Sequence, residues 1–197
     1  YGLAASFWYY GAAAWVDFYN VGSLEISSFG WFKLNSDSCA KDNPGVSGGG
    51  GILLDSLRRL IVAFSTFFGI GTNMQVEART LLVGINLCCQ WWIMHLVIES
   101  NSTIIVRVLN GQYQCRWSIS RELDQIWDLS SGLFKFQHCF REANKVADVL
   151  TNEGCLQSQA RVCAYEHIAN LPRLVRGEYG LDKLAYPSFR LRRRCTC

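Results

Sequence analysis

The chain has 197 residues, half of them hydrophobic, so it can bury one sizeable core and leaves little room for a second full domain. Charged residues make up only 18% and aromatic residues 13%, a composition that excludes an intrinsically disordered chain. The net charge of +3 arises at the end, where residues 173–197 hold seven basic and two acidic residues, and the body lacks the basic excess typical of tight nucleic-acid binding.

Residues 1–16 are apolar and uncharged, but Asp17 ends this run before it reaches the usual length of a membrane span. No basic segment precedes it, so a secretory signal is not indicated. We interpret residues 1–30 as an N-terminal extension with a packing segment, and we expect no association with membranes.

The first strand is predicted at Phe32–Asp37, where apolar and polar residues alternate. Lys41–Gly51 is rich in turn residues, with Asn43-Pro44-Gly45 and four consecutive glycines, and is predicted to be a loop. The apolar runs 52–54 and 60–68 then predict a β-hairpin.

Helical spacing of apolar residues predicts a helix over Asn73–Gln90, with Asn73 as its N-cap. A buried parallel strand at His95–Ile98 follows, and Gly154 is predicted to end the last helix. The remaining predicted elements are helices at 102–109, 118–129 and 143–153 and a strand at 133–139. The order β-β-β-α-β-α-α-β-α predicts an α/β fold whose mixed sheet has helices on both faces, with ligand chemistry at strand ends.

The nine cysteines show no CxxC pair and no regular disulfide spacing, which indicates reduced thiols and an intracellular protein. Cys195 and Cys197 could bind a soft metal, but a frayed terminus is the simpler interpretation. The run Arg190–Arg194 is compatible with a nuclear-localisation or nucleic-acid-binding patch and with a solvated basic tail.

Four strings occur in a shared order and spacing that is more specific than any one of them. They are Asp37-Ser-Cys followed by Asn43-Pro44-Gly45 and the glycines, Val76-Glu77-Ala78, Glu99-Ser-Asn101-Ser102, and His138-Cys-Phe-Arg-Glu-Ala-Asn144-Lys-Val-Ala-Asp148. Over residues 31–154 the chain resembles a type 1 ribonuclease H domain. With Lys33-Leu34-Asn35 and Leu171-Pro172-Arg173, it most resembles the ribonuclease H-like domains of plant retroelement reverse transcriptases.

This resemblance implies a mixed five-stranded sheet, three antiparallel strands followed by parallel ones. It also implies a site where carboxylates bind two Mg²⁺ ions for cleavage of RNA in RNA–DNA hybrids. Asp37, Glu77 and Asp148 match three metal ligands, and the fourth carboxylate is replaced by Asn101. Mg²⁺ prefers hard oxygen ligands, and a missing negative charge should weaken the binding of at least one ion. The resemblance therefore predicts an impaired enzyme.

His138 matches a family histidine that moves protons or aids product release, although a strand-end histidine can also be purely structural. Glu99 lies on the same strand face as Asn101 and could reach toward the metals, but we favour an acidic residue that never touches them. His95 and His167 match no family position and are interpreted as structural or solvated.

Asn43 and Asn73 match family positions that contact the nucleic-acid backbone, and their alternative roles are a turn residue and a helix cap. The implied partner is an RNA–DNA hybrid, and the implied location is intracellular, nuclear or cytoplasmic. Residues 31–154 would form the ribonuclease H-like domain and residues 155–197 a basic C-terminal extension.

Three family glycines are replaced, by Ser38, Arg58 and Trp92. A side chain at a position with positive φ costs roughly 1–2 kcal/mol, so these replacements predict local strain. They leave two alternatives to the enzyme: a non-catalytic nucleic-acid-binding or interaction module of retroelement origin, and a relic that keeps only a partly stable fold.

Overall fold

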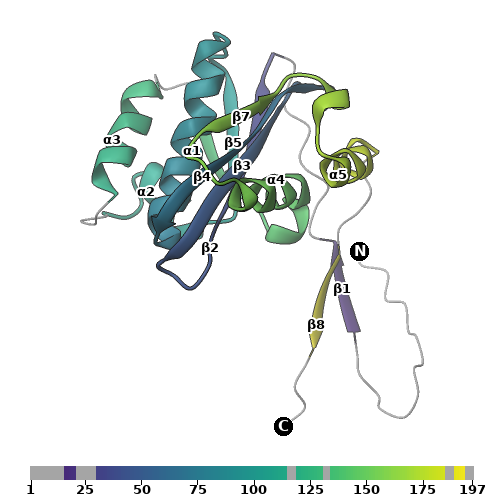
Figure 1. Ribbon diagram of the computed structural model, residues 1–197, viewed down its shortest axis with the longest axis horizontal. Coiled ribbons are helices and arrows are strands. Elements are labelled where there is room, and N and C mark those ends of the chain that lie inside the picture. Colours follow the sequence, from purple (N-terminus) through teal and green to yellow (C-terminus); the bar gives the residue numbers. More distant parts are fainter. Residues whose placement is uncertain (1–15, 21–29, 115–118, 131–133, 185–188, 194–197) are drawn as a thin grey trace.

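The computed structural model describes residues 16–20, 30–114, 119–130, 134–184 and 189–193 (Figure 1). The predictions for residues 1–15, Arg194, Cys195 and Cys197 lie outside these ranges. Near the two ends of the chain, β1 (Val16–Asn20) pairs antiparallel with β8 (Phe189–Arg193), so the described part of the basic run lies in a strand. None of the described helices is long and apolar enough to cross a membrane.

A six-stranded mixed sheet in the order β6-β5-β2-β3-β4-β7 forms the centre of the molecule. Its strands are β2 (Phe32–Ala40), β3 (Gly45–Leu54), β4 (Leu60–Gly71), β5 (Leu96–Ser100), β6 (Phe134–His138) and β7 (Val162–Tyr165). The meander β2-β3-β4 is antiparallel, and β5 and β6 add parallel strands beside β2. The predicted mixed sheet is confirmed, and it gains a sixth strand because β7 pairs with β4.

Helices cover both faces of this sheet, as predicted (Figure 1). They are α1 (Asn73–Gln90), α2 (Thr103–Leu109), α3 (Ser120–Leu129), α4 (Lys145–Leu156) and α5 (Arg173–Lys183), with the short 3-10 turns η1 (Arg141–Ala143) and η2 (Ile168–Asn170). Helices α1, α2 and α3 lie on one face, and α4 and α5 lie on the other.

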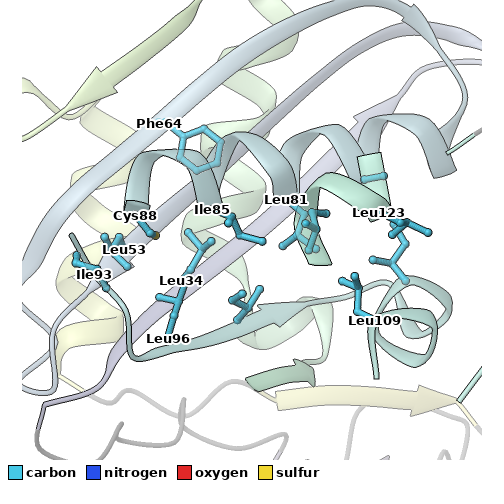
Figure 2. Packing of buried hydrophobic residues seen from close by; sticks show 14 of the residues in the cluster. Leu34, Leu53, Phe64, Leu81, Ile85, Cys88, Ile93, Leu96, Leu109 and Leu123 are labelled. Carbon is cyan, nitrogen blue, oxygen red and sulfur yellow. The ribbon is translucent and has the colours of Figure 1, made fainter. Parts of the chain in front are cut away.

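Each face buries its own hydrophobic cluster. On the α1 face, Leu34 and Phe64 of the sheet pack with Leu81 and Ile85 of α1 (Figure 2). The α4 face holds a second cluster of strand and helix residues, which includes Ile52, Leu54, Leu150, Val175 and Tyr179. Burial of apolar side chains on two faces of one sheet holds α1 and α4 against the central strands.

The four glycines Gly48–Gly51 lie inside β3, so the prediction of a loop over Lys41–Gly51 is wrong beyond Pro44. A Cβ on Gly50 would lie 2.5 Å from the backbone of Leu150 and Thr151 in α4. A Cβ on Gly49, on the opposite face, would collide with Thr80 of α1. Here glycine allows two helices to approach the same strand from both sides.

Two predicted helix ends need correction. The N-cap of α1 is Thr72 rather than Asn73, because the Thr72 hydroxyl accepts from the Gln75 amide and the Gln75 side chain accepts from the Thr72 amide. Gly154 does not end α4, which continues to Leu156. A Cβ on Gly154 would lie 2.5 Å from the carbonyl oxygen of Thr66, so this glycine serves close helix-sheet packing.

The backbone at two of the three replaced glycines is left-handed, as predicted. Arg58 has φ 57° and Trp92 has φ 56°, values that side-chain-bearing residues rarely adopt. Ser38 instead lies in β2, paired with Gly49, so the prediction of strain is wrong there. The chain therefore holds large side chains at two turns that favour glycine.

Candidate active site

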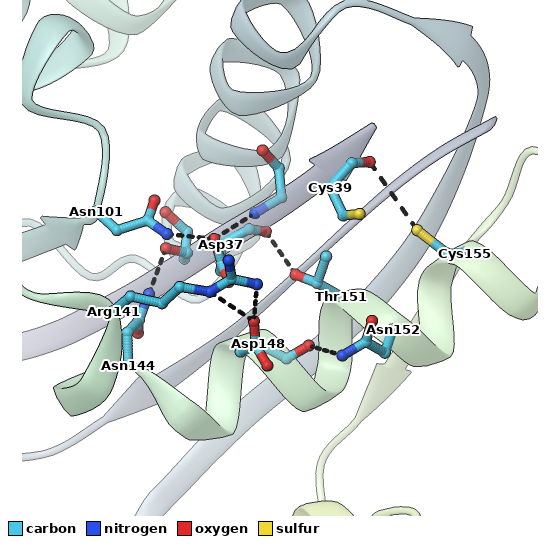
Figure 3. A network of polar contacts seen from close by, with 11 residues as sticks. Asp37, Cys39, Asn101, Arg141, Asn144, Asp148, Thr151, Asn152 and Cys155 are labelled. Carbon is cyan, nitrogen blue, oxygen red and sulfur yellow. Dashed lines mark hydrogen bonds and ion pairs between the residues drawn. The ribbon is translucent and has the colours of Figure 1, made fainter. Parts of the chain in front are cut away.

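Three elements bring Asp37, Asn101 and Asp148 together at one edge of the sheet (Figure 3). Asp37 lies within β2, and Asn101 follows the end of the parallel neighbour β5. Asp148 lies in the first turn of α4. Glu77 belongs to the first part of α1, and its carboxyl group is hydrogen-bonded by the side chain of Ser102, next to Asn101.

The carboxylate of Asp37 is 4% exposed and has one satisfied and one unsatisfied oxygen. Its Oδ1 accepts from the Asn101 Nδ2 at 2.7 Å and from the Ser38 amide at 2.9 Å. Its Oδ2 is buried and has no hydrogen-bond partner among the described residues. Such an oxygen is costly to bury unless something binds it.

Burial is the largest cause that raises the pKa of Asp37 from 3.8 to about 6, and the nearby charge of Asp148 raises it further. Hydrogen bonds from Ser38 and Asn101 and the positive charge of Arg141 act in the opposite direction. Burial also raises the pKa of Glu77. Both carboxyl groups are thus poised to gain from a cation that compensates their charge.

Arg141 is a site residue that the sequence reasoning missed. Its Nη2 and Nε donate to Oδ1 of Asp148 at 2.7 and 3.2 Å (Figure 3). It lies in η1, the turn between β6 and α4, seven residues before Asp148. The only sequence signal was its place in the Arg-Glu-Ala-Asn string, because no helical or strand spacing connects it to the aspartate.

Buried polar contacts fix β2 against α4 beneath the carboxylates. Asn144 Nδ2 donates to the carbonyl oxygen of Ser36 at 2.8 Å, and the Thr151 hydroxyl donates to that of Asp37 at 2.7 Å. The backbone oxygen of Asn144 also accepts from the Asp148 amide. These contacts set the position of Asp148 relative to Asp37.

Glu99 takes no part in the carboxylate group around Asp37. Its Oε1 lies 2.7 Å from Lys33 Nζ, and its Oε2 accepts from Asn35 Nδ2 at 3.0 Å. Lys33 and Glu99 are both buried. The carboxylate is therefore committed to an internal ion pair, in line with our preference for a residue that does not touch metal.

The other predicted residues lie at the surface. Asn43 and Asn73 meet, since Asn43 Oδ1 accepts from the Asn73 backbone amide at 2.8 Å. His138, at the end of β6, is exposed, and its ring packs edge-to-face on Phe140 with centroids 5.4 Å apart. His95 packs on Trp31 in the same geometry, as expected for a structural histidine.

Within the described ranges, no group of three or more His, Cys, Asp or Glu side chains is arranged closely enough to hold a metal ion. The donors nevertheless suit a hard cation, because Asp37 offers an unsatisfied buried oxygen and Asp148 offers a second carboxylate beside it. Asp37 and Asp148 are the two residues that could hold Mg²⁺, and Glu77 is connected to them only through Ser102, next to Asn101.

The cysteines of the described residues are Cys39, Cys88, Cys89, Cys139, Cys155 and Cys163, and all six are free thiols. Burial raises the pKa of Cys139 to about 12, and it raises the pKa of Cys155 to about 11. These two thiols are therefore protonated at neutral pH.

Comparison with known proteins shows which family the chain belongs to. Residues 35–154 match the family model described as "Reverse transcriptase-like". The chain is 30% identical over 129 residues to "Putative ribonuclease H protein At1g65750" of Arabidopsis thaliana. This match covers 62% of the chain but only 20% of that protein, so the chain spans about a fifth of its curated relative.

Solved structures of ribonucleases H share the fold. Ribonuclease H1 of Halobacterium salinarum superimposes with a TM-score of 0.60 at 21% identity, over 62% of this chain and 96% of that one. LC11 ribonuclease H1, isolated from compost and solved with an RNA/DNA hybrid, gives a TM-score of 0.60 at 25% identity, over 63% and 96% of the chains. The N-terminal ribonuclease H domain of the Mycobacterium tuberculosis protein rv2228c gives a TM-score of 0.61 at 20% identity, over 63% of this chain and 92% of that one.

Proposed function

Because this chain belongs to the reverse transcriptase-like family and has a ribonuclease H-like fold, we propose that it is a Mg²⁺-dependent endonuclease for RNA in RNA–DNA hybrids, slowed by Asn101. The observation that carries this proposal is that the carboxylates of Asp37 and Asp148 lie close together and that Oδ2 of Asp37 has no hydrogen-bond partner. We propose that residues 31–154 are the ribonuclease H-like domain and that the basic extension, residues 155–197, adds β7 to its sheet and α5 to its α4 face.

In this proposal Asp37, Asp148 and Glu77 hold the metal, which supplies activation of water and charge stabilisation at the phosphate. Asn101 contributes a neutral side chain where a fourth carboxylate would add charge. His138 is exposed at the end of β6, so its imidazole is accessible to accept or deliver a proton, the role that the resemblance implies. These roles are the ones that the family resemblance implies for the matching residues of this chain.

Asn43 and Asn73 would contact the hybrid from the turn before β3 and the start of α1. Both side chains are exposed, and their mutual hydrogen bond ties the turn to the helix that carries Glu77. Amides of this kind can bind 2′-hydroxyl and phosphate groups. We propose an intracellular site of action, nuclear or cytoplasmic, and a retroelement origin.

The test is cleavage of a labelled RNA–DNA hybrid with MgCl₂ by the purified chain, its Asn101→Asp variant and its Asp37→Asn variant. We expect slow cleavage by the wild type, at least a tenfold gain in the Asn101→Asp variant, and none in Asp37→Asn. Equal rates in all three would contradict a carboxylate-dependent site.

A non-catalytic nucleic-acid-binding module is the second candidate, and a specific observation favours it. Asn101 donates to Oδ1 of Asp37 and Arg141 pairs with Oδ1 of Asp148, so one oxygen of each carboxylate already has a partner without any metal. Hybrid binding by gel shift, with no cleavage by the wild type or by the Asn101→Asp variant, would identify this function.

A further inference from the structure

The guanidinium group of Arg141 lies close to the carboxylates of both Asp148 and Asp37 (Figure 3). Two of its nitrogens donate to one oxygen of Asp148, at 2.7 and 3.2 Å. The side chain of Arg141 is 70% exposed, whereas that of Asp148 is 30% exposed. The cation thus approaches from solvent, as an entering metal ion would.

The charge of Arg141 acts on both aspartates. The pKa of Arg141 is raised first by its hydrogen bond to Asp148, then by the charge of Asp148, and to a smaller extent by the charge of Asp37. In return, Arg141 is among the groups that lower the pKa of Asp37. One exposed cation therefore compensates two carboxylates on different elements.

Asn101 changes the balance of charge around this cation. With Asp37 and Asp148 ionised, the two carboxylates around Arg141 carry two negative charges, and Arg141 reduces the net charge to −1. A carboxylate at position 101 would have added one more. The guanidinium therefore offsets a larger share of the negative charge here than it would in a four-carboxylate site.

We infer that Arg141 is a built-in counter-ion of this site, and that a divalent cation must displace its guanidinium from Asp148 before it can bind there. This inference rests on the proposed metal site. An exposed ion pair is weak, so the displacement is feasible for an ion that gains two carboxylates. The arginine then sets the concentration of metal at which the site fills.

The experiment measures binding of Mn²⁺ to the full chain by electron paramagnetic resonance of the free ion, at a pH well above 6. The variants are Arg141→Gln, which removes the charge, and Arg141→Lys, which keeps it. Arg59→Gln is the matched control, because Arg59 is 67% exposed and pairs with Asp55 at 2.6 Å. We expect Arg141→Gln to bind Mn²⁺ roughly two- to fivefold more tightly, and the other two variants to bind like the wild type.

A second readout needs no variant. In the ¹⁵N-labelled wild type, the Nε–H resonance of Arg141 should shift during a MgCl₂ titration with the dissociation constant of the metal, because the hydrogen bond to Asp148 is lost. An unchanged resonance while metal binds, or equal Mn²⁺ affinity in wild type and Arg141→Gln, would overturn the inference and leave the proposed function intact. No metal binding by wild type or Arg141→Gln would overturn both.

Discussion

The Nδ2 amide of Asn101 donates a 2.7 Å hydrogen bond to Oδ1 of Asp37. A carboxylate at position 101 could not donate this bond when ionised and would place a like charge against Asp37. The replacement therefore removes a possible ligand and also engages an oxygen of another one. At this position asparagine favours the stability of the metal-free protein, whereas aspartate would favour the binding of metal.

Asn101→Asp should consequently lower the free energy of unfolding without metal by roughly 1–3 kcal/mol, and MgCl₂ should restore more of it than in the wild type. Urea unfolding with and without MgCl₂ measures both effects. Asn110→Asp is the control, because Asn110 Nδ2 donates a 3.0 Å bond to the Phe136 carbonyl away from the carboxylates. An equal response to MgCl₂ in the two variants would count against a metal site at Asp37.

The raised pKa of Asp37 predicts a pH dependence of stability. Between about pH 4 and pH 6 the folded protein keeps a proton on Asp37 that the unfolded chain has lost, since the pKa is 3.8 in one state and about 6 in the other. The free energy of unfolding therefore falls as pH rises through this window. Across this window the free energy of unfolding of the wild type should fall by an amount on the order of 3 kcal/mol, and that of Asp37→Asn should not. Urea unfolding over about pH 4 to 7 tests it, and parallel curves would refute the assignment.

Glu99 should matter for stability rather than for metal binding. Glu99→Gln removes the carboxylate that Lys33 Nζ contacts at 2.7 Å inside the protein, and we expect it to cost roughly 3 kcal/mol. Chemical denaturation gives this cost, and Mn²⁺ affinity of the folded variant should equal that of the wild type. A weaker affinity with unchanged stability would show that Glu99 belongs to the metal site.

Glycine 50 should tolerate no side chain. Gly50→Ala would place a methyl group 2.5 Å from the backbone of α4, and we expect a loss of roughly 3 kcal/mol or failure to fold. Gly177→Ala in α5 is the control, because a Cβ there has no atom within 4 Å. That change should stabilise the protein by roughly 0.5–1 kcal/mol. Thermal unfolding of both variants decides the matter, and a stable Gly50→Ala protein would contradict the packing.

The left-handed backbone at Trp92 predicts a stabilising change. Trp92 is 87% exposed and has φ 56°, so Trp92→Gly should raise the free energy of unfolding by roughly 1 kcal/mol. Trp91→Gly is the control, because its φ is −93° and glycine gains nothing there. Urea denaturation compares the two. Destabilisation in both variants would mean that the side chain of Trp92 outweighs its backbone strain.

Much of the sheet was predictable because its strands follow simple patterns. The alternation that begins at Phe32 and the helical spacing over Asn73–Gln90 each carry one dominant period, and both elements form where predicted. Gly48–Gly51 were misassigned because glycine normally favours turns, and only the two helices packed on β3 make it the required residue there. Gly154 was misassigned in the same way, because its role is to let α4 pack closely on the sheet rather than to end the helix.

The site was predictable only in part. Asp37, Asn101 and Asp148 could be placed through motif order, and the structure brings them together. Arg141 could not, because its role depends on the path of the turn η1, which no periodicity encodes. The tie between Asn144 and the carbonyl oxygen of Ser36 was equally hidden, since it joins residues 108 positions apart.

The glycines of β3 affect the position of the carboxylates in the candidate active site. Between α1, which carries Glu77, and α4, which carries Asp148, the sheet at Gly49 and Gly50 is no thicker than a peptide chain. A single methyl group at either glycine would push one of these helices away from the sheet and so change the distance between the carboxylates without replacing any charged residue. The distance between the carboxylates therefore depends on the absence of side chains at Gly49 and Gly50.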